Sequence, residues 1–406
     1  MHAEARSGRM NLTAAFVYDL RVHFDGKDWH SHEFSPSTSI LTRYSDMFER
    51  LVVVGRGYKR LPFIPTPATV CSSDRVTFEV VDDLARGLNT FTKGGAVRDA
   101  MERILPGVDV VIVRMPGMIG AYAIDVAKEL GKPTIVEMVG DVWDSMWNHG
   151  SLRGKLWAPV AWANLRRSIA SATDVLYVTN EYLQRRYPTK GRSLGCSDVV
   201  LRRTVEDLDR RMARIDSKRT FRIGTIGSLD VLFKGLDTLL QAAAILRERH
   251  FDFRVSAVGG GDQRRWLAMA EKLGVADLVR FEGYMSHEKI SRWMEEIDLY
   301  VQPSRQEGLP RSVIEAMSMG CPTAGSSCGG LPELLQRDCI HRPGDHKRLA
   351  NIIARIIADP SEQKRLATRS LEIARQYLAE RLEPKREAFY REVASRALTH
   401  GSASAA

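Results

Sequence analysis

The chain has 406 residues, of which 44% are apolar and 27% charged, and it contains five cysteines. This length exceeds one ordinary α/β core and fits two domains, while the composition excludes a largely disordered chain. The cysteines show neither a CxxC pair nor metal-ligand spacing, which is typical of reduced thiols in a cytoplasm rather than of a disulfide framework. They are Cys71, Cys196, Cys321, Cys328 and Cys339.

The net charge of +9 and the pI near 9.3 favour anionic partners. Because no nucleic-acid-binding motif accompanies the charge, acidic lipid head groups and phosphorylated substrates are favoured and nucleic acid is not expected. A basic surface that serves solubility alone is the alternative interpretation.

The start of the chain shows no secretory signal, because residues 1–11 are polar. The best candidate for a membrane-spanning helix, Leu105–Ala127, is interrupted by Asp109, Arg114 and Asp125. We therefore expect a cytoplasmic protein that does not cross a membrane. Peripheral contact with the inner face of the plasma membrane stays open.

Strand-length apolar runs alternate with helical stretches along the first half of the chain. The predicted strands are Thr13–Tyr18, Leu51–Gly55, Val76–Val81, Asp109–Arg114, Thr134–Met138 and Asp174–Val178, separated by helices such as Arg98–Leu105 and Ala121–Gly131. The segment Val199–Thr220 is rich in Arg, Asp and Glu, and it is expected to be a linker with a short helix.

A second series of the same kind begins at Phe221. Its predicted strands are Phe221–Ile226, Phe253–Val258, Val279–Phe281, Leu299–Gln302 and Cys321–Ala324, and its helices are Leu236–Arg249, Gln263–Leu273, Ser286–Glu295 and Arg311–Met319. Such alternation predicts two α/β domains with doubly wound parallel sheets that face a cleft, where ligands bind at the carboxyl ends of strands.

We expect these domains to span residues 1–215 and 216–379. A C-terminal helix at about residues 380–398 should pack back on the first domain, and residues 400–406 should form a disordered tail.

Glycines follow two predicted strands of the second series. Gly227-Ser228 ends the first strand, and Lys234-Gly235 opens the next helix, where a lysine can neutralise a diphosphate. Taken alone, such a Lys-Gly pair is more often structural. Gly259-Gly260-Gly261 lacks the G-x-G-x-x-G spacing, which excludes a dehydrogenase site.

The most informative segment runs from Pro303 to Met317. Glu307 lies on the loop after a predicted strand, and Glu315 lies eight positions later within the following helix. The N-terminus of this helix then faces the cleft and offers free N–H groups to phosphate. A lone glutamate is usually a solvated charge, but Glu315 stands in an apolar run, where a carboxylate needs a partner.

In this order and spacing, the motifs resemble the donor-binding domain of the family-four retaining glycosyltransferases, which have the GT-B fold of glycogen synthase. The matching elements are Gly227 with Lys234-Gly235, Gly259-x-Gly261, Phe281-x-Gly283, Asp298 to Ser304, Glu307 with Glu315, Gly320-x-Pro322, and Gly329-Gly330-x-Pro332-Glu333. The resemblance covers residues 221–340. It implies a nucleoside diphosphate sugar as donor and co-substrate, with no cofactor.

The resemblance also implies roles for single residues. Lys234 would bind the donor diphosphate, Glu307 the transferred sugar and Glu315 the ribose, while the chain near Gly283-Tyr284 would hold the base. The complete set of implied donor-binding residues is Gly227, Ser228, Lys234, Gly283, Tyr284, Glu307, Gly308, Leu309, Pro310, Arg311, Ser312 and Glu315.

One departure from the family pattern concerns the diphosphate. Ser228 stands where many members carry Arg, so this contact is absent or comes from elsewhere, with Arg305 or Arg311 as candidates.

A second departure concerns the first domain. Gly140 stands where many members carry a His, which leaves Asp141 or Asp144 to face the sugar. Asp141 is therefore predicted as a catalytic residue together with Lys234 and Glu307. Near the start of the chain, only Asp25-Gly26 resembles the glycine loop that usually adjoins the phosphates.

No D-x-D pair suited to a divalent metal follows a predicted strand, so no metal is expected. Lys234, the helix N-terminus and arginines would neutralise the leaving diphosphate. An oxocarbenium-like transition state without paired carboxylates predicts front-face transfer with retention, in which the departing phosphate takes the acceptor proton.

The segment from Trp143 to Arg167 mixes tryptophans with aliphatic and basic residues. It either lies in a membrane interface or, as the commoner case, forms a core helix with its tryptophans inside. The basic pI favours a polyprenyl-diphosphate-linked oligosaccharide acceptor, as in bacterial capsule or exopolysaccharide biosynthesis. A soluble acceptor and a non-catalytic, sugar-nucleotide-binding scaffold of a polysaccharide complex stay open.

Overall fold

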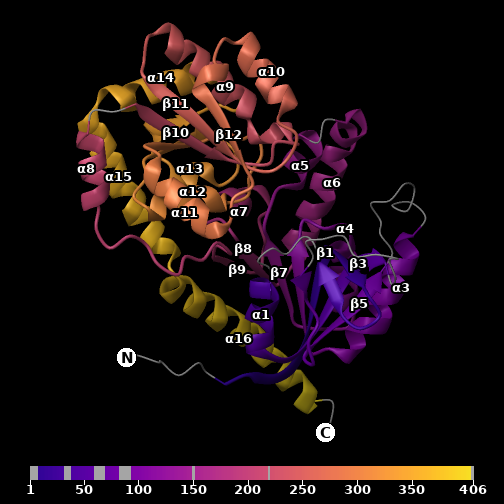
Figure 1. Cartoon of the computed structure of the whole chain (residues 1–406). Coiled ribbons are helices and arrows are strands. Elements are labelled where there is room, and N and C mark those ends of the chain that lie inside the picture. Colours follow the sequence, from indigo (N-terminus) through magenta and orange to yellow (C-terminus); the bar gives the residue numbers. More distant parts are fainter. Residues whose placement is uncertain are drawn as a thin grey trace.

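The computed structural model describes residues 8–31, 38–58, 69–81, 93–148, 151–217 and 220–403. These residues form two α/β domains, each built on its own sheet, and the last helix runs from the second domain back along the first (Figure 1). The predicted fold class of two doubly wound, parallel-sheet domains is confirmed.

The sheet of the first domain has the parallel order β5-β3-β1-β6-β7-β8-β9. Its strands are β1 (Met10–Phe24), β3 (Phe48–Tyr58), β5 (Val76–Val81), β6 (Val110–Met115), β7 (Thr134–Met138), β8 (Asp174–Tyr177) and β9 (Arg192–Gly195). The six predicted strands are all present. The seventh, β9, was not predicted.

Strand β1 is longer than predicted, and its last three residues pair antiparallel with β2 (Trp29–Ser31), which pairs antiparallel with β4 (Thr69–Val70). The sheet is therefore not purely parallel. Strands of two or three residues contain no apolar run, so a prediction from periodicity cannot find them.

Helices cover both faces of this sheet. They are α1 (Thr38–Met47), α3 (Gly94–Ile104), α4 (Met118–Glu129), α5 (Val142–Asn148), α6 (Leu152–Ser171) and α7 (Tyr182–Arg186). Successive residues of β1 alternate between two cores, since Ala14 and Phe16 lie with α1, whereas Ala15 and Val17 lie with α3 and α4.

The second sheet has the all-parallel order β12-β11-β10-β13-β14-β15. Its strands are β10 (Phe221–Ile226), β11 (Phe253–Val258), β12 (Val279–Gly283), β13 (Leu299–Gln302), β14 (Thr323–Ser326) and β15 (Ile340–His341), and its helices are α9 (Leu236–Glu248), α10 (Arg264–Lys272), α11 (His287–Glu296), α12 (Arg311–Ser318), α13 (Leu331–Leu334), α14 (His346–Ala358) and α15 (Pro360–Ala374). The strand order reverses between β10 and β13, which is where such sheets bind ligands.

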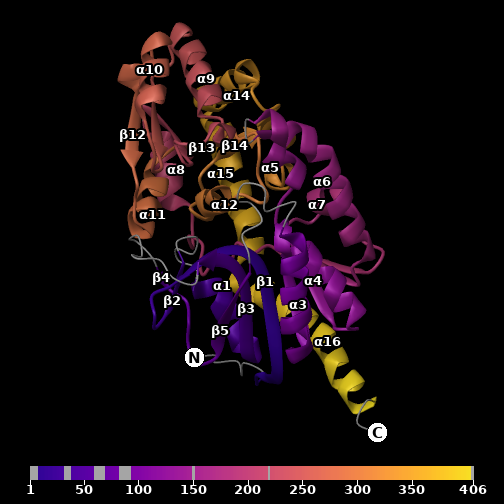
Figure 2. The ribbon, with the colours of Figure 1, turned by 90° about the vertical axis from the view of Figure 1, so that its right-hand side faces the viewer.

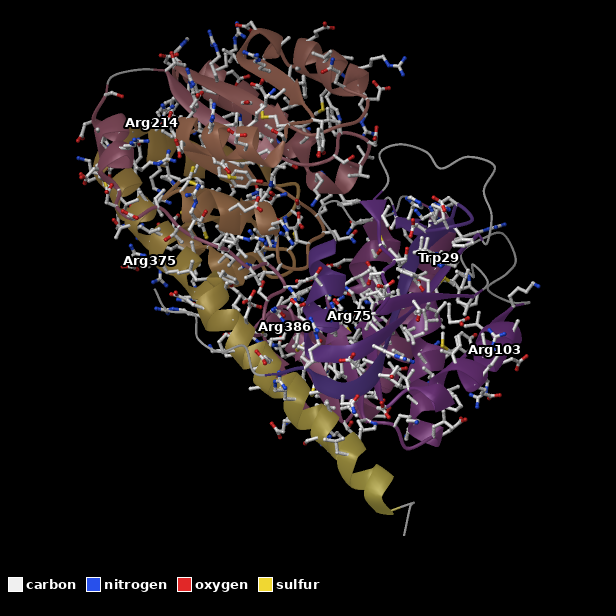
Figure 3. The ribbon with its side chains drawn as sticks, turned by 60° about the horizontal axis from the view of Figure 1, so that its bottom comes forward. Trp29, Arg75, Arg103, Arg214, Arg375 and Arg386 are labelled. Carbon is white, nitrogen blue, oxygen red and sulfur yellow. The ribbon has the colours of Figure 1, made fainter. Side chains whose placement is uncertain are left out.

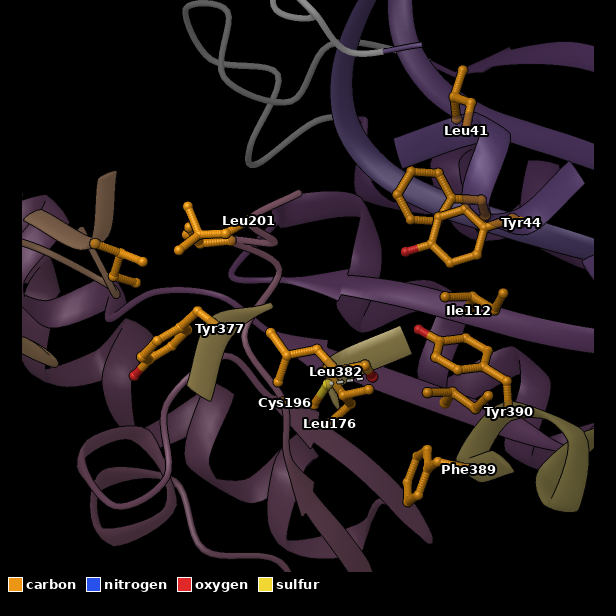
Figure 4. Close-up of a cluster of buried hydrophobic side chains, with 14 of the residues drawn as sticks. Leu41, Tyr44, Ile112, Leu176, Cys196, Leu201, Tyr377, Leu382, Phe389 and Tyr390 are labelled. Atoms are coloured by element: carbon orange, nitrogen blue, oxygen red, sulfur yellow. Dashed lines mark hydrogen bonds between the residues drawn. The ribbon is translucent and has the colours of Figure 1, made fainter. Parts of the chain in front are cut away.

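The linker pairs with the start of the last helix, α16 (Ala379–Ala403), through Leu201, and it contains the expected short helix α8 (Asp209–Asp216). Helix α16 lies against the first domain over much of its length (Figure 2). Its side chains Leu382, Phe389 and Tyr390 are buried in one cluster with Tyr44, Ile112 and Leu176 of the first domain (Figure 4).

Polar contacts also fix α16. Arg386, labelled in Figure 3, donates to the carbonyl of Ser197, and Arg396 pairs with the buried Asp174 at 2.6 Å. The helix continues to Ala403, so residues 400–403 are helical and not disordered as predicted, because Gly401 alone does not end the helix. Residues 404–406 lie outside the described part of the chain. No helix of the described residues is long and apolar enough to cross a membrane.

Candidate functional site

The candidate site lies where β10 and β13 end, at the reversal of strand order. After Gly227, the 3-10 turn Leu232–Lys234 brings Lys234 back toward the end of β13. Gly235 follows with φ +74°, and a Cβ there would lie 2.0 Å from the carbonyl oxygen of Pro303. Glycine is therefore required for this turn to press against the loop after β13.

Glu307 is the centre of the site. Its Oε1 accepts hydrogen bonds from Lys234 Nζ at 2.8 Å, Ser304 Oγ at 2.7 Å and Gln302 Nε2 at 3.1 Å. Only 9% of the side chain is exposed. Within the described residues no donor reaches Oε2, so one carboxylate oxygen is held in place and the other can accept a bond from a ligand.

A buried chain of hydrogen bonds holds Glu307 in place through Gln302. Gln302 Oε1 accepts from Tyr300 OH at 2.7 Å and from Ser312 Oγ at 3.2 Å, and the Tyr300 oxygen accepts from the N–H of Ile226. Burial raises the pKa of Tyr300 well above its ordinary value, so its hydroxyl remains a donor. The amide orientation of Gln302, and through it Glu307, is thereby tied to both β10 and β13.

Both glutamates of the predicted pair lie near enough to the Tyr300 hydroxyl for their charges to raise its pKa. Glu315 is half-buried on α12, next to the buried Ile314 and Ala316. Pro310 directly precedes this helix, and Arg311 is exposed in its first position. The structure thus brings Lys234, Glu307 and the start of α12 together.

The loop at Gly308-Leu309 packs backbone against backbone between the two domains. A Cβ on Gly308 would lie 2.4 Å from the carbonyl oxygen of Val139 in the first domain, and the Gly308 oxygen accepts from Gly330 N at 2.7 Å. Gly329 has φ +56°, and a Cβ there would meet the carbonyl oxygen of Glu307 at 2.1 Å. The glycines of the Gly-Gly-x-Pro-Glu motif therefore keep this loop thin beside Glu307.

The residues predicted to face the base and one phosphate lie on the same edge of the sheet. Gly283 ends β12 with φ +70°, its carbonyl accepts from Gly259 N at 2.9 Å, and Tyr284 after it is largely exposed. Ser228 is exposed after β10, where its Oγ accepts from Asp230 N at 3.3 Å. Both loops follow strands of the same parallel sheet and therefore lie at the edge of the sheet where Lys234 and Glu307 lie.

Of the two arginines considered in place of the missing one, Arg305 is engaged within the domain. Its guanidinium donates to both carboxylate oxygens of Asp237, at 2.8 and 2.6 Å. Arg311 pairs with no carboxylate of the described residues and remains the better candidate. No group of His, Cys, Asp or Glu side chains in the described chain has an arrangement that could hold a metal ion.

Asp141 does not face the cleft as predicted, because its side chain is 1% exposed and fully engaged. Its Oδ1 accepts from Tyr187 OH at 2.6 Å and from Trp143 N at 2.8 Å, and its Oδ2 accepts from Tyr182 OH and Arg186. Asp141 therefore holds α7 against the start of α5. Sequence spacing could not reveal that three side chains of α7 and its flank converge on this carboxylate.

Asp144, the other carboxylate considered, is more open. Burial and the neighbouring Asp141 raise its pKa, while its Oδ2 accepts from Tyr182 OH at 3.0 Å. Burial, with smaller contributions from Glu307 and Asp144, raises the pKa of the Cys328 thiol to about 12, and Lys234 opposes the rise. Asp144 thus shares an interdomain space with the Lys234–Glu307 pair.

The Asp25-Gly26 pair forms the turn between β1 and β2. Asp25 Oδ1 accepts from the N–H groups of Asp28 and Lys27, both at 2.7 Å, and these bonds lower its pKa to about 2. In this structure the carboxylate shapes its own turn.

Helices α5 and α6 are not the core helix that was the commoner expectation. Trp143 and Trp147 stack with ring centroids 5.5 Å apart, and Leu152 and Leu156 are 80% and 77% exposed. The α5–α6 surface, as we call it, comprises the exposed apolar residues Trp147, Leu152, Leu156, Trp157 and Val160 with the exposed basic residues Arg153, Lys155, Arg166 and Arg167.

A cavity of about 600 Å³ lies between the domains beside this surface. Trp162, Arg166, Tyr182, Arg185 and Arg186 line it from the first domain, and Gly329 and Glu333 from the second. The Glu333 carboxylate crosses between the domains and accepts from the N–H groups of Asn180, Glu181 and Tyr182, at 2.6, 3.1 and 2.8 Å.

Residues 220–359, which contain the Lys234–Glu307 site, match the family model of the group 1 glycosyl transferases. Protein CapJ of Staphylococcus aureus is 28% identical over 347 residues, which cover 84% of this chain and 85% of that protein. Residues 220–359 therefore form a group 1 glycosyltransferase domain. The amylovoran biosynthesis glycosyltransferase AmsK of Erwinia amylovora is 32% identical over 133 residues, which cover 30% of this glycosyltransferase and 33% of AmsK.

A solved structure has the same fold as this chain. The crystal structure of HepE from Anabaena in complex with UDP superposes with a TM-score of 0.63 and 16% identity, covering 94% of this chain and all of the other. This glycosyltransferase therefore has the GT-B fold, as the resemblance implied.

Proposed function

We propose that this glycosyltransferase moves a sugar from a nucleoside diphosphate sugar to its acceptor with retention of anomeric configuration. The observation that carries the proposal is the Lys234–Glu307 pair at the reversal of strand order, next to the start of α12. Lys234 would bind the diphosphate, the free Oε2 of Glu307 the sugar hydroxyls, and Glu315 the ribose. The complex of HepE with UDP supports a nucleoside diphosphate as the ligand.

Negative charge develops on the leaving diphosphate as the bond to the sugar breaks. Lys234, the first N–H groups of α12 and Arg311, all on the second domain, would stabilise that charge. The sugar passes through an oxocarbenium-like state. The acceptor hydroxyl forms the new bond on the same face, and its proton moves to the departing phosphate oxygen. Activity that survives removal of divalent cations with EDTA is expected.

The acceptor in this proposal is a polyprenyl-diphosphate-linked oligosaccharide, and the role is bacterial capsule or exopolysaccharide biosynthesis at the inner face of the plasma membrane. The likeness to an amylovoran biosynthesis glycosyltransferase supports a role in polysaccharide biosynthesis. The α5–α6 surface supports membrane contact, because exposed Trp and Leu beside Arg and Lys suit an interface with anionic lipid.

Flotation with vesicles tests the membrane contact. The chain should float with phosphatidylglycerol vesicles and much less with phosphatidylcholine vesicles, and a Leu152→Glu/Leu156→Glu variant should lose flotation. Leu398→Glu, a change of an exposed leucine on α16, is the matched control. Absence of binding to the anionic vesicles at low salt would exclude a peripheral membrane role and favour a soluble acceptor.

Thermal-shift measurements with UDP-, GDP- and ADP-sugars test the donor site. A ligand that binds only the folded state stabilises it by about 2.7 kcal/mol at 100 times its Kd. One nucleotide class should raise the melting temperature, and the effect should vanish in Lys234→Ala and Glu315→Ala. The exposed α10 residues Lys272 and Glu271 supply the matched controls Lys272→Ala and Glu271→Ala.

The anomeric configuration of the product tests retention. A β-linked product from an α-linked donor would refute it.

A further inference from the structure

The interdomain cavity carries three guanidinium groups on one wall. Arg166 belongs to α6, and Arg185 and Arg186 belong to α7. The volume of about 600 Å³ lies within the range of small-molecule sites, roughly 300–1,000 Å³, and exceeds what one bound ion needs.

The acidic groups on this cavity are already engaged. Glu181 pairs with Arg185, and Glu333 accepts three backbone N–H bonds. Arg166 lies over the ring of Trp162, 5.1 Å from its centroid, and pairs with no carboxylate of the described residues. The cavity therefore presents uncompensated positive charge at Arg166. Arg185 lines the same cavity, and its ion pair with Glu181 is exposed on both sides and therefore weak, so it can exchange Glu181 for a ligand phosphate. Planar guanidinium groups bind phosphate oxygens through paired hydrogen bonds.

The cavity adjoins both the reacting site and the α5–α6 surface. Gly329 forms part of its wall and packs directly on the backbone of Glu307. On the other side, Trp162 and Arg166 follow Trp157 and Val160 along the same helix. A ligand with a phosphate in this cavity could thus extend a sugar toward Glu307 and an apolar chain toward the exposed face of α6.

From these contacts we infer that the cavity between α6, α7 and the Gly329–Glu333 segment binds the phosphate of a lipid-linked acceptor, held by Arg166 and Arg185. This inference rests on the proposed function and adds the location of the acceptor phosphate. Arg186 serves a different purpose, because it is bound to Asp141 and keeps α7 in position.

Calorimetric titration of the full chain with farnesyl diphosphate tests the inference. The donor site is first saturated with the nucleoside diphosphate that binds best, so that the probe cannot occupy it. We expect the Arg166→Gln/Arg185→Gln variant to bind farnesyl diphosphate at least about tenfold more weakly, since charged hydrogen bonds are lost. The control Arg202→Gln/Arg203→Gln changes two exposed arginines of the linker, outside both the cavity and the α5–α6 surface, and should bind normally.

Two further probes separate the sources of the phosphate. Inorganic diphosphate and farnesol should each bind more weakly than farnesyl diphosphate. If inorganic diphosphate binds as tightly and depends on the same arginines, the ligand is a free phosphate compound and the lipid-linked acceptor is wrong. Equal affinity of wild type and Arg166→Gln/Arg185→Gln for farnesyl diphosphate overturns the site.

Nucleotide binding by the same proteins keeps the two proposals apart. Normal nucleotide binding by Arg166→Gln/Arg185→Gln shows that the variant is folded and its donor site intact, so a lost response to farnesyl diphosphate then concerns the cavity alone. If wild type binds no nucleoside diphosphate, the proposed function fails first, and the inference fails with it.

Discussion

Glu333 joins the two domains, and its removal should uncouple donor binding from catalysis. In Glu333→Ala, the N–H groups of Asn180, Glu181 and Tyr182 lose their common acceptor. Hydrogen bonds to a charged group contribute about 1.5–3 kcal/mol each when well buried. Two of these three are at the surface, so we expect about 2 kcal/mol for the set after allowing for screening by water.

If these bonds form only when the domains are closed, 2 kcal/mol lowers the ratio of closed to open molecules about 30-fold. The value of kcat/KM for release of the nucleoside diphosphate should fall by a similar factor. Donor binding measured by thermal shift should persist, because Lys234, Glu307 and Glu315 all belong to the second domain. Small-angle scattering should show a larger radius of gyration.

Glu333→Gln provides the graded control, since its amide oxygen still accepts a hydrogen bond but carries no charge, and its activity should lie between those of wild type and Glu333→Ala. The reasoning is refuted if Glu333→Ala keeps its kcat/KM and radius of gyration. A fall in melting temperature with unchanged kcat/KM would also refute it, because the contact would then only support the fold.

Three other changes test different parts of the structure. Gly308→Ala places a Cβ 2.4 Å from Val139 O and should reduce turnover at least about tenfold while donor binding persists; Gly107→Ala, which meets open space, is its control. Ser304→Ala removes one of the three donors to Glu307 and should weaken donor binding about fivefold in a titration. Asp198, in the segment between the domains' sheets, pairs with the buried Arg114 of β6. Burial raises the pKa of Asp198, but Arg114 lowers the value to about 2 overall, so about 2 kcal/mol of unfolding free energy should be present above pH 4 and lost as the pH falls to 2. Asp198→Asn should remove this contribution in denaturant titrations across that range.

Most of the fold could be predicted because its strands are buried on both faces. The run Leu299–Gln302 is buried at every position, and the structure has this strand, Phe253–Val258 and Thr134–Met138 with the predicted bounds. What the sequence could not supply were the short antiparallel strands Trp29–Ser31 and Thr69–Val70, since their pairing depends on the unusual length of β1 and not on their own composition.

The candidate site was predictable where one segment carries several groups at fixed spacing, as with Glu307 and Glu315 on either side of one helix start. The residues that hold Glu307 in place could not be predicted from that spacing. Tyr300 and Gln302 stand in a strand with buried apolar neighbours, and only the structure shows that their polar ends point along one chain of hydrogen bonds to Glu307. A polar residue inside a buried strand is the signal that could have found them, because burying it needs a partner.

The α5–α6 segment shows why composition alone leaves such a surface undecided. Tryptophans and leucines have the same apolar area in a core and on a surface, and what separates the two cases is which neighbours cover them. Pro159 lies within α6, and Ala158, Leu165 and Ile169 are the buried residues of that helix. The helix therefore packs on the domain mainly through its second half, and most side chains of its first half are exposed. The same helix then reaches the interdomain cavity with Trp162 and Arg166. An apolar face that leads directly to a basic cavity is the arrangement that the proposed acceptor, with its apolar chain and its phosphate, would use, whereas a soluble glycoside would leave the apolar face without a role.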